Sequence, residues 1–154
     1  MKISEILSKD CIKIGLKSKT KKEVLEELVD VLAAAGKVKD KKKVMQALIE
    51  REELGSTGIG HGVAIPHAKT DDVENGIAAF GLSKEGVRFD TLDGDPVNIF
   101  FLLIAPYGAS GIHLKSLARI SGLLKDKYFR KKIINCQNAD EISDLINEEE
   151  KLKI

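Results

Sequence analysis

The sequence has little of what marks several common classes of protein. It contains two cysteines, Cys11 and Cys136, and neither has a second cysteine near it in the chain. Such an isolated pair gives neither a disulfide framework nor a metal knuckle or redox pair. The 25 lysines and arginines are balanced by 24 acidic residues, which leaves a formal net charge of +1. This balance gives no case for a nucleic-acid binder or for electrostatic attachment to a membrane.

Long hydrophobic runs are also absent. The longest spans residues 99–105, far below the roughly 20 residues needed to cross a bilayer. The first seven residues are too short and too polar for a signal peptide. We therefore expect a soluble, cytoplasmic protein that does not insert into a membrane. Its 154 residues, 43% hydrophobic and 32% charged, suit one compact domain over residues 1–154.

The order of the predicted elements indicates an α/β protein. Period-two alternation or short apolar runs predict strands at 11–16, 63–65, 77–82, 87–89 and 97–105. Helical spacing of apolar residues predicts helices at 1–9, 20–36, 40–53, 112–125, 127–134 and from 139 onward. The strand at 97–105 is nearly all apolar, so we expect it to be central and covered on both faces. The interleaved order predicts one mixed β-sheet flanked by helices.

Capping patterns support the predicted helix ends. Thr20 and Glu23 have capping-box spacing, as do Asn138 and Glu141 before the last helix. Asp40 is expected to cap the helix that follows, and Gly36 to end the one before it in a left-handed conformation. In the helix at 112–125, the residues expected to face inward are Leu114, Leu117, Ala118, Ser121 and Leu124.

The most informative segment is rich in glycine. Residues 55–68 read Gly-Ser-Thr-Gly-Ile-Gly-His-Gly-Val-Ala-Ile-Pro-His-Ala, with four glycines in the first eight positions. Ordering so many glycines costs conformational entropy, which favours a place where the backbone turns tightly or approaches a ligand. Their unobstructed amides can form an anion-binding nest. We expect a phosphate-stabilising loop built on Thr57, Gly58, Gly60 and Gly62, with the Thr57 hydroxyl supporting it.

Two histidines and an arginine are candidates for the chemistry. His67 follows Pro66, and a neutral imidazole nitrogen is a competent nucleophile near neutral pH; the alternative is a half-buried histidine satisfied by a backbone carbonyl. His113 stands at a predicted helix start, where phosphate is favoured, although a surface or capping histidine is also found there. The planar guanidinium of Arg51 could bind phosphate oxygens; the alternative is a positive charge that only interacts favourably with the dipole at a helix C-terminus.

The segment at 55–68 resembles the signature of the type-2 enzyme IIA domains of the bacterial phosphoenolpyruvate-dependent phosphotransferase system, the fructose/mannitol and nitrogen-regulatory class. Residues 86–97 and 113–118 are also similar to that family. The resemblance implies an α/β sandwich with a mixed sheet and no required metal or cofactor. It implies that His67 accepts phosphate from HPr and passes it to a cysteine or histidine of an enzyme IIB domain. His113 is then the second active-site histidine, and Arg51 a charged neighbour.

Some alternatives stay open at this stage. A nitrogen-branch domain would bind target proteins according to its phosphorylation state. A metal-dependent hydrolase would use His61, His67 and His113, but the motif has no carboxylate at supporting spacing. His61 has no assigned role in transfer and is expected to be an exposed loop side chain. For docking of HPr we expect an exposed apolar surface, with Ile59, Ile65 and Leu114 as candidates.

Overall fold

One mixed sheet organises the protein, whose computed structural model describes residues 2–153. Its order is β1-β5-β6-β3-β2, and β4 also pairs with β6. The pairs β5/β6 and β2/β3 are antiparallel, whereas β1/β5, β3/β6 and β4/β6 are parallel. The strands are β1 Ile12–Ile14, β2 Gly58–Gly60, β3 Val63–Ala64, β4 His67–Lys69, β5 Ile77–Val87 and β6 Val97–Ala105.

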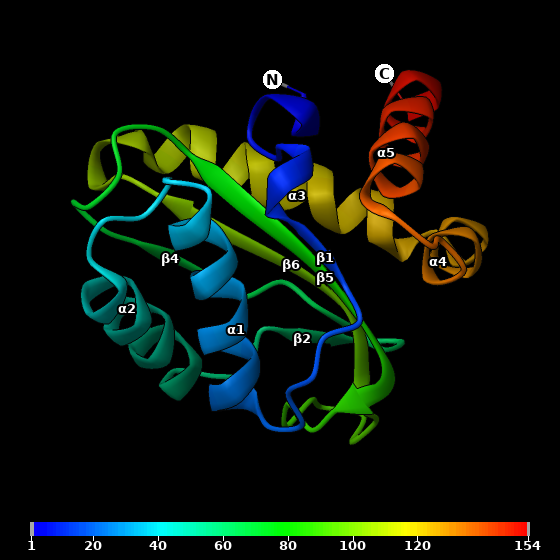
Figure 1. Cartoon of the computed structure of the whole chain (residues 1–154), viewed down its shortest axis with the longest axis horizontal. Coiled ribbons are helices and arrows are strands. Elements are labelled where there is room, and N and C mark those ends of the chain that lie inside the picture. Colours follow the sequence, from blue (N-terminus) through cyan, green and yellow to red (C-terminus); the bar gives the residue numbers. More distant parts are fainter. Residues whose placement is uncertain (1, 154) are drawn as a thin grey trace.

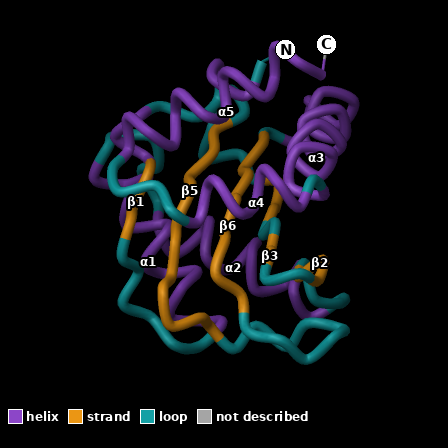
Figure 2. Tube along the Cα trace, turned by 90° about the vertical axis from the view of Figure 1, so that its right-hand side faces the viewer, coloured by secondary structure: helices purple, strands orange, loops and turns teal. Residues whose placement is uncertain are grey.

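Helices cover both faces of this sheet. On one face α1 packs against β5 and α2 against β4, and on the other α3 packs against β6 and α5 against β1 (Figures 1 and 2). The α-helices are α1 Lys21–Ala34, α2 Lys41–Glu53, α3 Ser110–Lys125, α4 Lys127–Ile134 and α5 Ala139–Lys153. The short 3-10 helices are η1 Ile3–Glu5, η2 Lys9–Cys11 and η3 Tyr107–Ala109. The predicted α/β single domain with a mixed, helix-flanked sheet is confirmed.

The predicted caps are present. Thr20 accepts a hydrogen bond from the Glu23 amide at the start of α1, and Asp40 accepts one from the Lys43 amide at the start of α2. Gly36, with φ +74°, ends α1 in the left-handed region that glycine adopts at little cost. These local bonds satisfy amides that a helix terminus leaves unpaired, so both helices begin where the sequence predicts.

The central position of β6 is also confirmed. Eight of its nine residues are buried, and it pairs with β5 on one side and with β3 and β4 on the other. Phe101 meets Phe80 of β5 edge-on with ring centroids 5.7 Å apart. Because β6 is held on both sides, the short strand β4 that pairs with it has a rigid support.

The prediction of a helix at residues 2–9 is wrong. The segment forms η1 and then begins η2. The Ile3 amide donates to both carboxylate oxygens of Glu150, at 3.0 and 2.9 Å, and Arg119 pairs with the same carboxylate at 3.3 Å. This contact with α5, 147 residues away in sequence, satisfies an amide that a helix start leaves without an intrahelical partner, and it holds η1 against α5. The residue Met1 lies outside the described residues.

Several strand boundaries differ from the predictions. The strand expected at 11–16 is reduced to β1. Pro66 ends β3 as expected, but the chain resumes as β4 at the next residue, because a proline lacks only its own N–H. The segments at 77–82 and 87–89 are not separate strands: β5 runs through Val87, with an irregular register between Leu82 and Val87. The glycine-rich loop contains the short strand β2.

The predicted inward face of α3 is confirmed at Leu124 and in part at Leu117, but it is wrong at Leu114 and Ala118. The buried residues are His113, Ser116, Ile120, Leu123 and Leu124. Leu114 is 67% exposed, and α3 begins at Ser110 rather than at residue 112. Apolar side chains therefore lie on the outer side of the first turns of α3, and a histidine occupies the inner side.

Candidate active site

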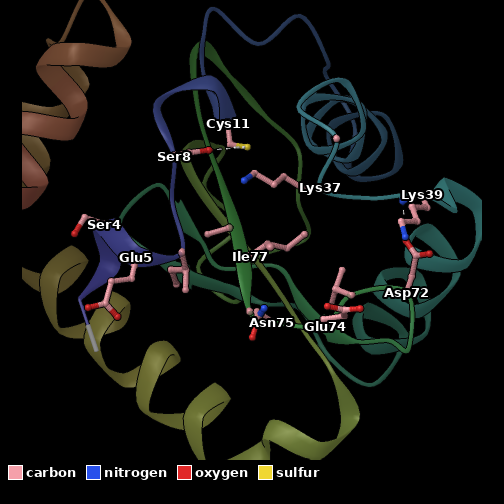
Figure 3. Close-up of a pocket in the computed structure, with 15 residues that line it drawn as sticks. Ser4, Glu5, Ser8, Cys11, Lys37, Lys39, Asp72, Glu74, Asn75 and Ile77 are labelled. Atoms are coloured by element: carbon pink, nitrogen blue, oxygen red, sulfur yellow. Dashed lines mark hydrogen bonds between the residues drawn. The ribbon is translucent and has the colours of Figure 1, made fainter.

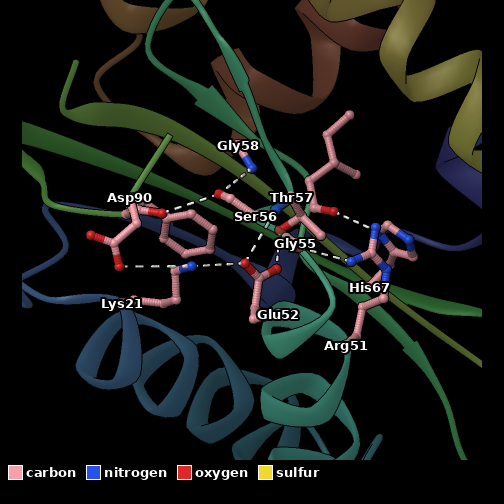
Figure 4. Close-up of polar contacts among 11 residues, drawn as sticks. Lys21, Arg51, Glu52, Gly55, Ser56, Thr57, Gly58, His67 and Asp90 are labelled. Atoms are coloured by element: carbon pink, nitrogen blue, oxygen red, sulfur yellow. Dashed lines mark hydrogen bonds and ion pairs between the residues drawn. The ribbon is translucent and has the colours of Figure 1, made fainter. Parts of the chain in front are cut away.

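His67 is the first residue of β4, where the sheet holds its backbone. The residue lies opposite Leu103 of β6, and the Leu103 amide donates to the Pro66 carbonyl at 2.9 Å. Its ring Nδ1 is 2.8 Å from the carbonyl oxygen of Ile65 (Figure 4). A carbonyl oxygen only accepts hydrogen bonds, so Nδ1 carries the hydrogen. In the neutral ring Nε2 then keeps its lone pair.

The surroundings of His67 favour that neutral ring. Burial, the largest effect, lowers the pKa of His67 below its usual value of 6.5, and the nearby charge of Arg51 lowers it further. The Ile65 carbonyl and the Glu52 carboxylate act in the opposite direction without reversing the shift. At neutral pH the side chain is therefore unprotonated at Nε2, as a nucleophile must be.

His113 reaches the same place from the first turns of α3. Its ring centroid is 5.7 Å from that of His67, with the ring planes inclined at 53°. The side chain is buried, and its Nδ1 has no hydrogen-bond partner among the described residues. Burial, together with the charges of His67 and Lys69, lowers the pKa of His113 to about 4. A buried unpaired nitrogen costs free energy, so a polar group arriving beside it would relieve that cost.

Arg51 lies beside His67 in the last turn of α2 (Figure 4). One of its guanidinium nitrogens, Nη1, donates to the Gly55 carbonyl at 2.9 Å. This bond steadies the planar group and leaves other N–H donors of the guanidinium for an anion. The structure therefore brings together His67, His113 and Arg51, which lie far apart in the sequence.

Glu52 organises the glycine-rich loop, and the sequence analysis missed it. Its buried carboxylate accepts hydrogen bonds from the amide and the hydroxyl of Thr57, and it pairs with Lys21 Nζ at 3.1 Å (Figure 4). The available signal was helical spacing: Glu52 follows the buried Val44 and Leu48 at intervals of four residues on α2. Such a stripe faces the core.

The loop amides have partners inside the protein. The Thr57 amide donates to Glu52 and the Gly58 amide to the Ser56 hydroxyl, at 3.1 Å each. The expected support of the loop by the Thr57 hydroxyl is present as its bond to Glu52. Because these amides are engaged, they contribute to the site by fixing the loop rather than by facing an anion. For Gly60 and Gly62, which both have positive φ, phosphate stabilisation stays a prediction.

Lys69 is a second residue that the sequence analysis did not single out. It is two positions after His67 on β4, so both side chains point to one face of the sheet. Its Nζ donates to the hydroxyl of Ser110 at 2.8 Å, where α3 begins. Together with Arg51 it surrounds the two histidines with positive charge.

His61 lies apart from this cluster, exposed on the turn between β2 and β3. Among residues 2–153 there is no group of three histidine, cysteine or acidic side chains arranged to hold a metal ion. A metal site joining His61, His67 and His113 therefore has no support in the geometry.

Exposed apolar side chains lie at the start of α3 and on β2. Ile112 and Leu114 of α3 and Tyr107 of η3 are 58%, 67% and 65% exposed, and Ile59 of β2 is 43% exposed. The expectation for Ile65 is wrong, because its side chain is buried and it contributes its carbonyl to His67 instead. None of the helices in residues 2–153 is long and apolar enough to cross a membrane.

The chain belongs to a known family. Residues 5–149 match the family described as "Phosphoenolpyruvate-dependent sugar phosphotransferase system, EIIA 2". It is 45% identical over 151 residues to the PTS system fructose-specific EIIABC component of Bacillus subtilis (strain 168), covering 98% of this chain and 24% of that protein. The chain thus spans about a quarter of that relative. Membership in the family gives it a general role in phosphoryl transfer.

Solved structures agree with this assignment. The nitrogen regulatory protein IIA-Ntr of Neisseria meningitidis is similar with a TM-score of 0.88 and 35% identity, over 94% of this chain and 98% of that one. The mannitol enzyme IIA of Escherichia coli, solved in complex with phosphorylated enzyme IIB, shares the fold with a TM-score of 0.78 and 23% identity, over 93% of this chain and 99% of that one. The relatives therefore include both a fructose-specific phosphotransferase-system component and nitrogen regulatory proteins.

Proposed function

We propose that this chain is a phosphoryl carrier that accepts a phosphoryl group from HPr on Nε2 of His67 and passes it to an enzyme IIB domain. The observation that carries the proposal is the bond between His67 Nδ1 and the Ile65 carbonyl. It selects the tautomer whose lone pair is on Nε2, and it does so with a backbone atom held next to β4. The lowered pKa of His67 keeps that lone pair available at neutral pH.

The proposed transfer balances without loss of a proton. The Nε2 lone pair forms the new P–N bond while the P–N bond of the donor histidine breaks, and the bonding electrons return to the donor ring. The phosphorylated ring of His67 retains its Nδ1 hydrogen and therefore carries positive charge, which the Ile65 carbonyl dipole stabilises. In the second transfer the nucleophile of the IIB domain attacks phosphorus, and the electrons of the P–N bond return to Nε2.

The neighbours of His67 have supporting roles in this proposal. Phosphoryl transfer depends mainly on positioning and on stabilising charge on the phosphoryl oxygens. Arg51 supplies guanidinium N–H donors, and neutral His113 donates one hydrogen bond from its ring. Since His113 is uncharged at neutral pH, it stabilises the phosphoryl group only moderately. A carrier needs this restraint, because a group bound too tightly would not be passed on.

Docking of both partners is proposed over the exposed side chains of Ile59, Tyr107, Ile112 and Leu114. Apolar side chains exposed together are a common feature of protein-binding surfaces. Contact there would exclude water from the two histidines during transfer. The complex between the mannitol enzyme IIA and phosphorylated enzyme IIB of Escherichia coli supports a IIB domain as the acceptor.

A regulatory role is the second candidate. It is favoured by the similarity to the Neisseria meningitidis nitrogen regulatory protein, which extends over 98% of that chain. In that case the phosphorylation state of His67 would control binding to a target protein. Affinity capture with unmodified and phosphorylated protein separates the two roles, because a sugar relay requires transfer to a IIB domain whereas a regulator retains targets in one state.

The decisive experiment is intact-mass spectrometry after incubation with phosphoenolpyruvate, enzyme I and HPr. We expect one acid-labile phosphoryl group on the wild-type protein and none on His67→Ala. His61→Asn is the matched control, because it removes an exposed histidine from the same segment and should still be phosphorylated. Heteronuclear NMR of the imidazole nitrogens should locate the group on Nε2. An unmodified wild-type protein with active upstream components, or modification of His67→Ala, would refute the proposal.

A further inference from the structure

A polar pocket, which we call the α4 pocket, lies away from His67 between the β2–β3 turn, the start of β6 and helix α4. Its volume is about 460 Å³, within the range of roughly 300–1,000 Å³ usual for small-molecule sites. The residues that line it are His61, Gly62, Asn98, Ile99, Lys127, Arg130, Lys131 and Ile134. The lining thus contains three permanent cations and a histidine, and no carboxylate.

This one-sided charge is unusual within a chain whose charges are balanced. Three other pockets each have acidic as well as basic residues in their linings. In the pocket between η1, η2 and β5, Lys37 points inward but Glu5, Asp72 and Glu74 line the same space (Figure 3). The lining of the α4 pocket contains no such carboxylate, so positive charge predominates there and favours the approach of anions.

Within the described part of the chain the cations of the α4 pocket make no ion pair, although Lys127 Nζ lies over the Tyr128 ring, 5.5 Å from its centroid. Among the ion pairs of residues 2–153, none includes Lys127, Arg130 or Lys131. Lys127 and Lys131 are four residues apart on α4 and therefore share one face of the helix. Two nearby carboxylates have other contacts: Asp126 accepts the Tyr128 and Phe129 amides at the start of α4, and Asp93 is bound to the loop backbone.

Hydrogen bonds within the protein fix the guanidinium group of Arg130. Its Nη1 donates to the carbonyls of Leu124 and Lys125 at 2.9 and 2.7 Å. These bonds fix the guanidinium plane at the end of α3 while leaving other N–H donors of the group. A cation fixed in advance loses less conformational entropy when an anion binds.

The backbone at His61 provides an independent observation. His61 has φ +57°, and its neighbours Gly60 and Gly62 have φ +89° and +77°. Glycine is favoured in this left-handed region, whereas a side chain there costs free energy. The His61 amide donates to Asp93 Oδ2 at 3.2 Å, which helps to hold the turn. Strained residues of this kind cluster at functional sites. Here the left-handed turn brings the imidazole of His61 to the lining of the pocket.

The α4 pocket is separate from the transfer site. Ile99 of the pocket pairs with Val63, whereas His67 pairs with Leu103. Four residues along β6 correspond to about 13 Å at the usual rise of a strand. A ligand in the pocket would therefore not occupy Nε2 of His67.

We propose that the α4 pocket binds a small organic anion carrying two or more phosphate groups. The three positive charges of the lining match such an ion better than a single phosphate. The volume exceeds what a phosphate ion fills, and the 45% exposed Ile134 provides apolar contact for a ring or carbon chain. The proposal does not depend on the phosphoryl-carrier function of His67.

The test is isothermal titration calorimetry of the full chain with a nucleoside diphosphate, inorganic pyrophosphate and inorganic phosphate. We expect saturable binding that weakens in that order. Lys127→Gln and Lys131→Gln should each weaken binding of the nucleoside diphosphate about tenfold, as expected for loss of one charge-assisted contact. Lys132→Gln is the matched control, because Lys132 is exposed beside Lys131 on α4 but does not line the pocket. It should bind within twofold of the wild type.

NMR amide shifts locate the bound ligand. Shifts centred on Gly62, Asn98 and Ile99, retained in a His67→Ala background, would support the α4 pocket. The proposal is overturned by the absence of saturable binding of both diphosphates, by equal weakening in Lys132→Gln and Lys131→Gln, or by shifts centred on His67 and His113. The last outcome would show that the anion binds at the transfer site instead.

Discussion

Replacing Glu52 by glutamine tests whether one buried carboxylate holds the glycine-rich loop in place. The Glu52 side chain is 5% exposed and pairs with Lys21, whose side chain is 21% exposed. It also accepts two hydrogen bonds from Thr57. Glutamine keeps the size of the side chain but removes its charge, so the substitution weakens these contacts without leaving a large cavity.

The magnitude follows from the contacts that lose their charge. A hydrogen bond to a charged group contributes about 1 kcal/mol more than a neutral one, so the two bonds from Thr57 together lose about 2 kcal/mol. Leaving the partly buried Lys21 with only Asp90, 4.0 Å away, as an ion-pair partner adds up to about 1 kcal/mol, since exposure of Lys21 moderates the penalty. We expect Glu52→Gln to lower the free energy of unfolding by about 2–3 kcal/mol, and Tm by roughly 5–10 °C for a chain of this size.

Urea unfolding of the wild type and the variant measures this loss directly. Glu53→Gln is the control, since Glu53 is the next residue of α2 and is exposed; its effect should stay within about 0.5 kcal/mol. Phosphorylation of His67 should also slow in Glu52→Gln, because Arg51 and Gly55 flank the same loop. A loss below about 0.5 kcal/mol in Glu52→Gln would refute the reasoning that the carboxylate supports the loop.

Three further predictions concern other parts of the chain. The pKa of His113 falls from 6.5 to about 4, so between these pH values the unfolded chain binds more protons; stability should rise by up to about 3 kcal/mol from pH 4 to 6.5 and then level off. Urea midpoints should show a smaller rise in His113→Gln, and an equal rise would contradict the assignment. Gly86 has φ +87°, and a Cβ there would lie 2.8 Å from Pro96 Cβ. Gly86→Ala should therefore lower the free energy of unfolding by about 2–3 kcal/mol, measured by thermal unfolding. An effect near zero would disprove the clash. Glu150→Gln should cost about 1–2 kcal/mol and speed hydrogen exchange of the Ile3 amide; unchanged exchange would mean that this contact does not hold the N-terminus.

Local patterns predicted the parts of the fold that depend on local interactions. The caps at Thr20 and Asp40 are satisfied within one helical turn, and Gly36 ends α1 through its own backbone freedom. The apolar run of β6 predicted its central position, because a strand without polar alternation must be covered on both faces. The N-terminal helix was predicted wrongly; the segment forms η1, whose Ile3 amide bonds to Glu150 at the other end of the chain.

The candidate site likewise has residues that the sequence predicted and residues that it did not. The motif at residues 55–68 and its family resemblance marked His67, His113 and Arg51, but the positions that organise them were not marked. Glu52 was overlooked although its spacing on α2 placed it on the inner face, because a carboxylate is rarely buried without a partner and its partners Thr57 and Lys21 come from other segments. The outward turn of Leu114 likewise depends on how α3 packs against β6.

By itself, the sequence determined the class of the fold, the well-capped helices, the central strand and the residues that mark the family, because these follow from periodicity, capping and motif within short stretches of chain. The tertiary structure alone decided which nitrogen of His67 is available and that His113 is neutral and buried beside it. It also decided that His61 lines the pocket beside α4 rather than the site of His67. These properties arise from carbonyls, burial and charges that folding brings together from distant segments, and no local pattern encodes their distances.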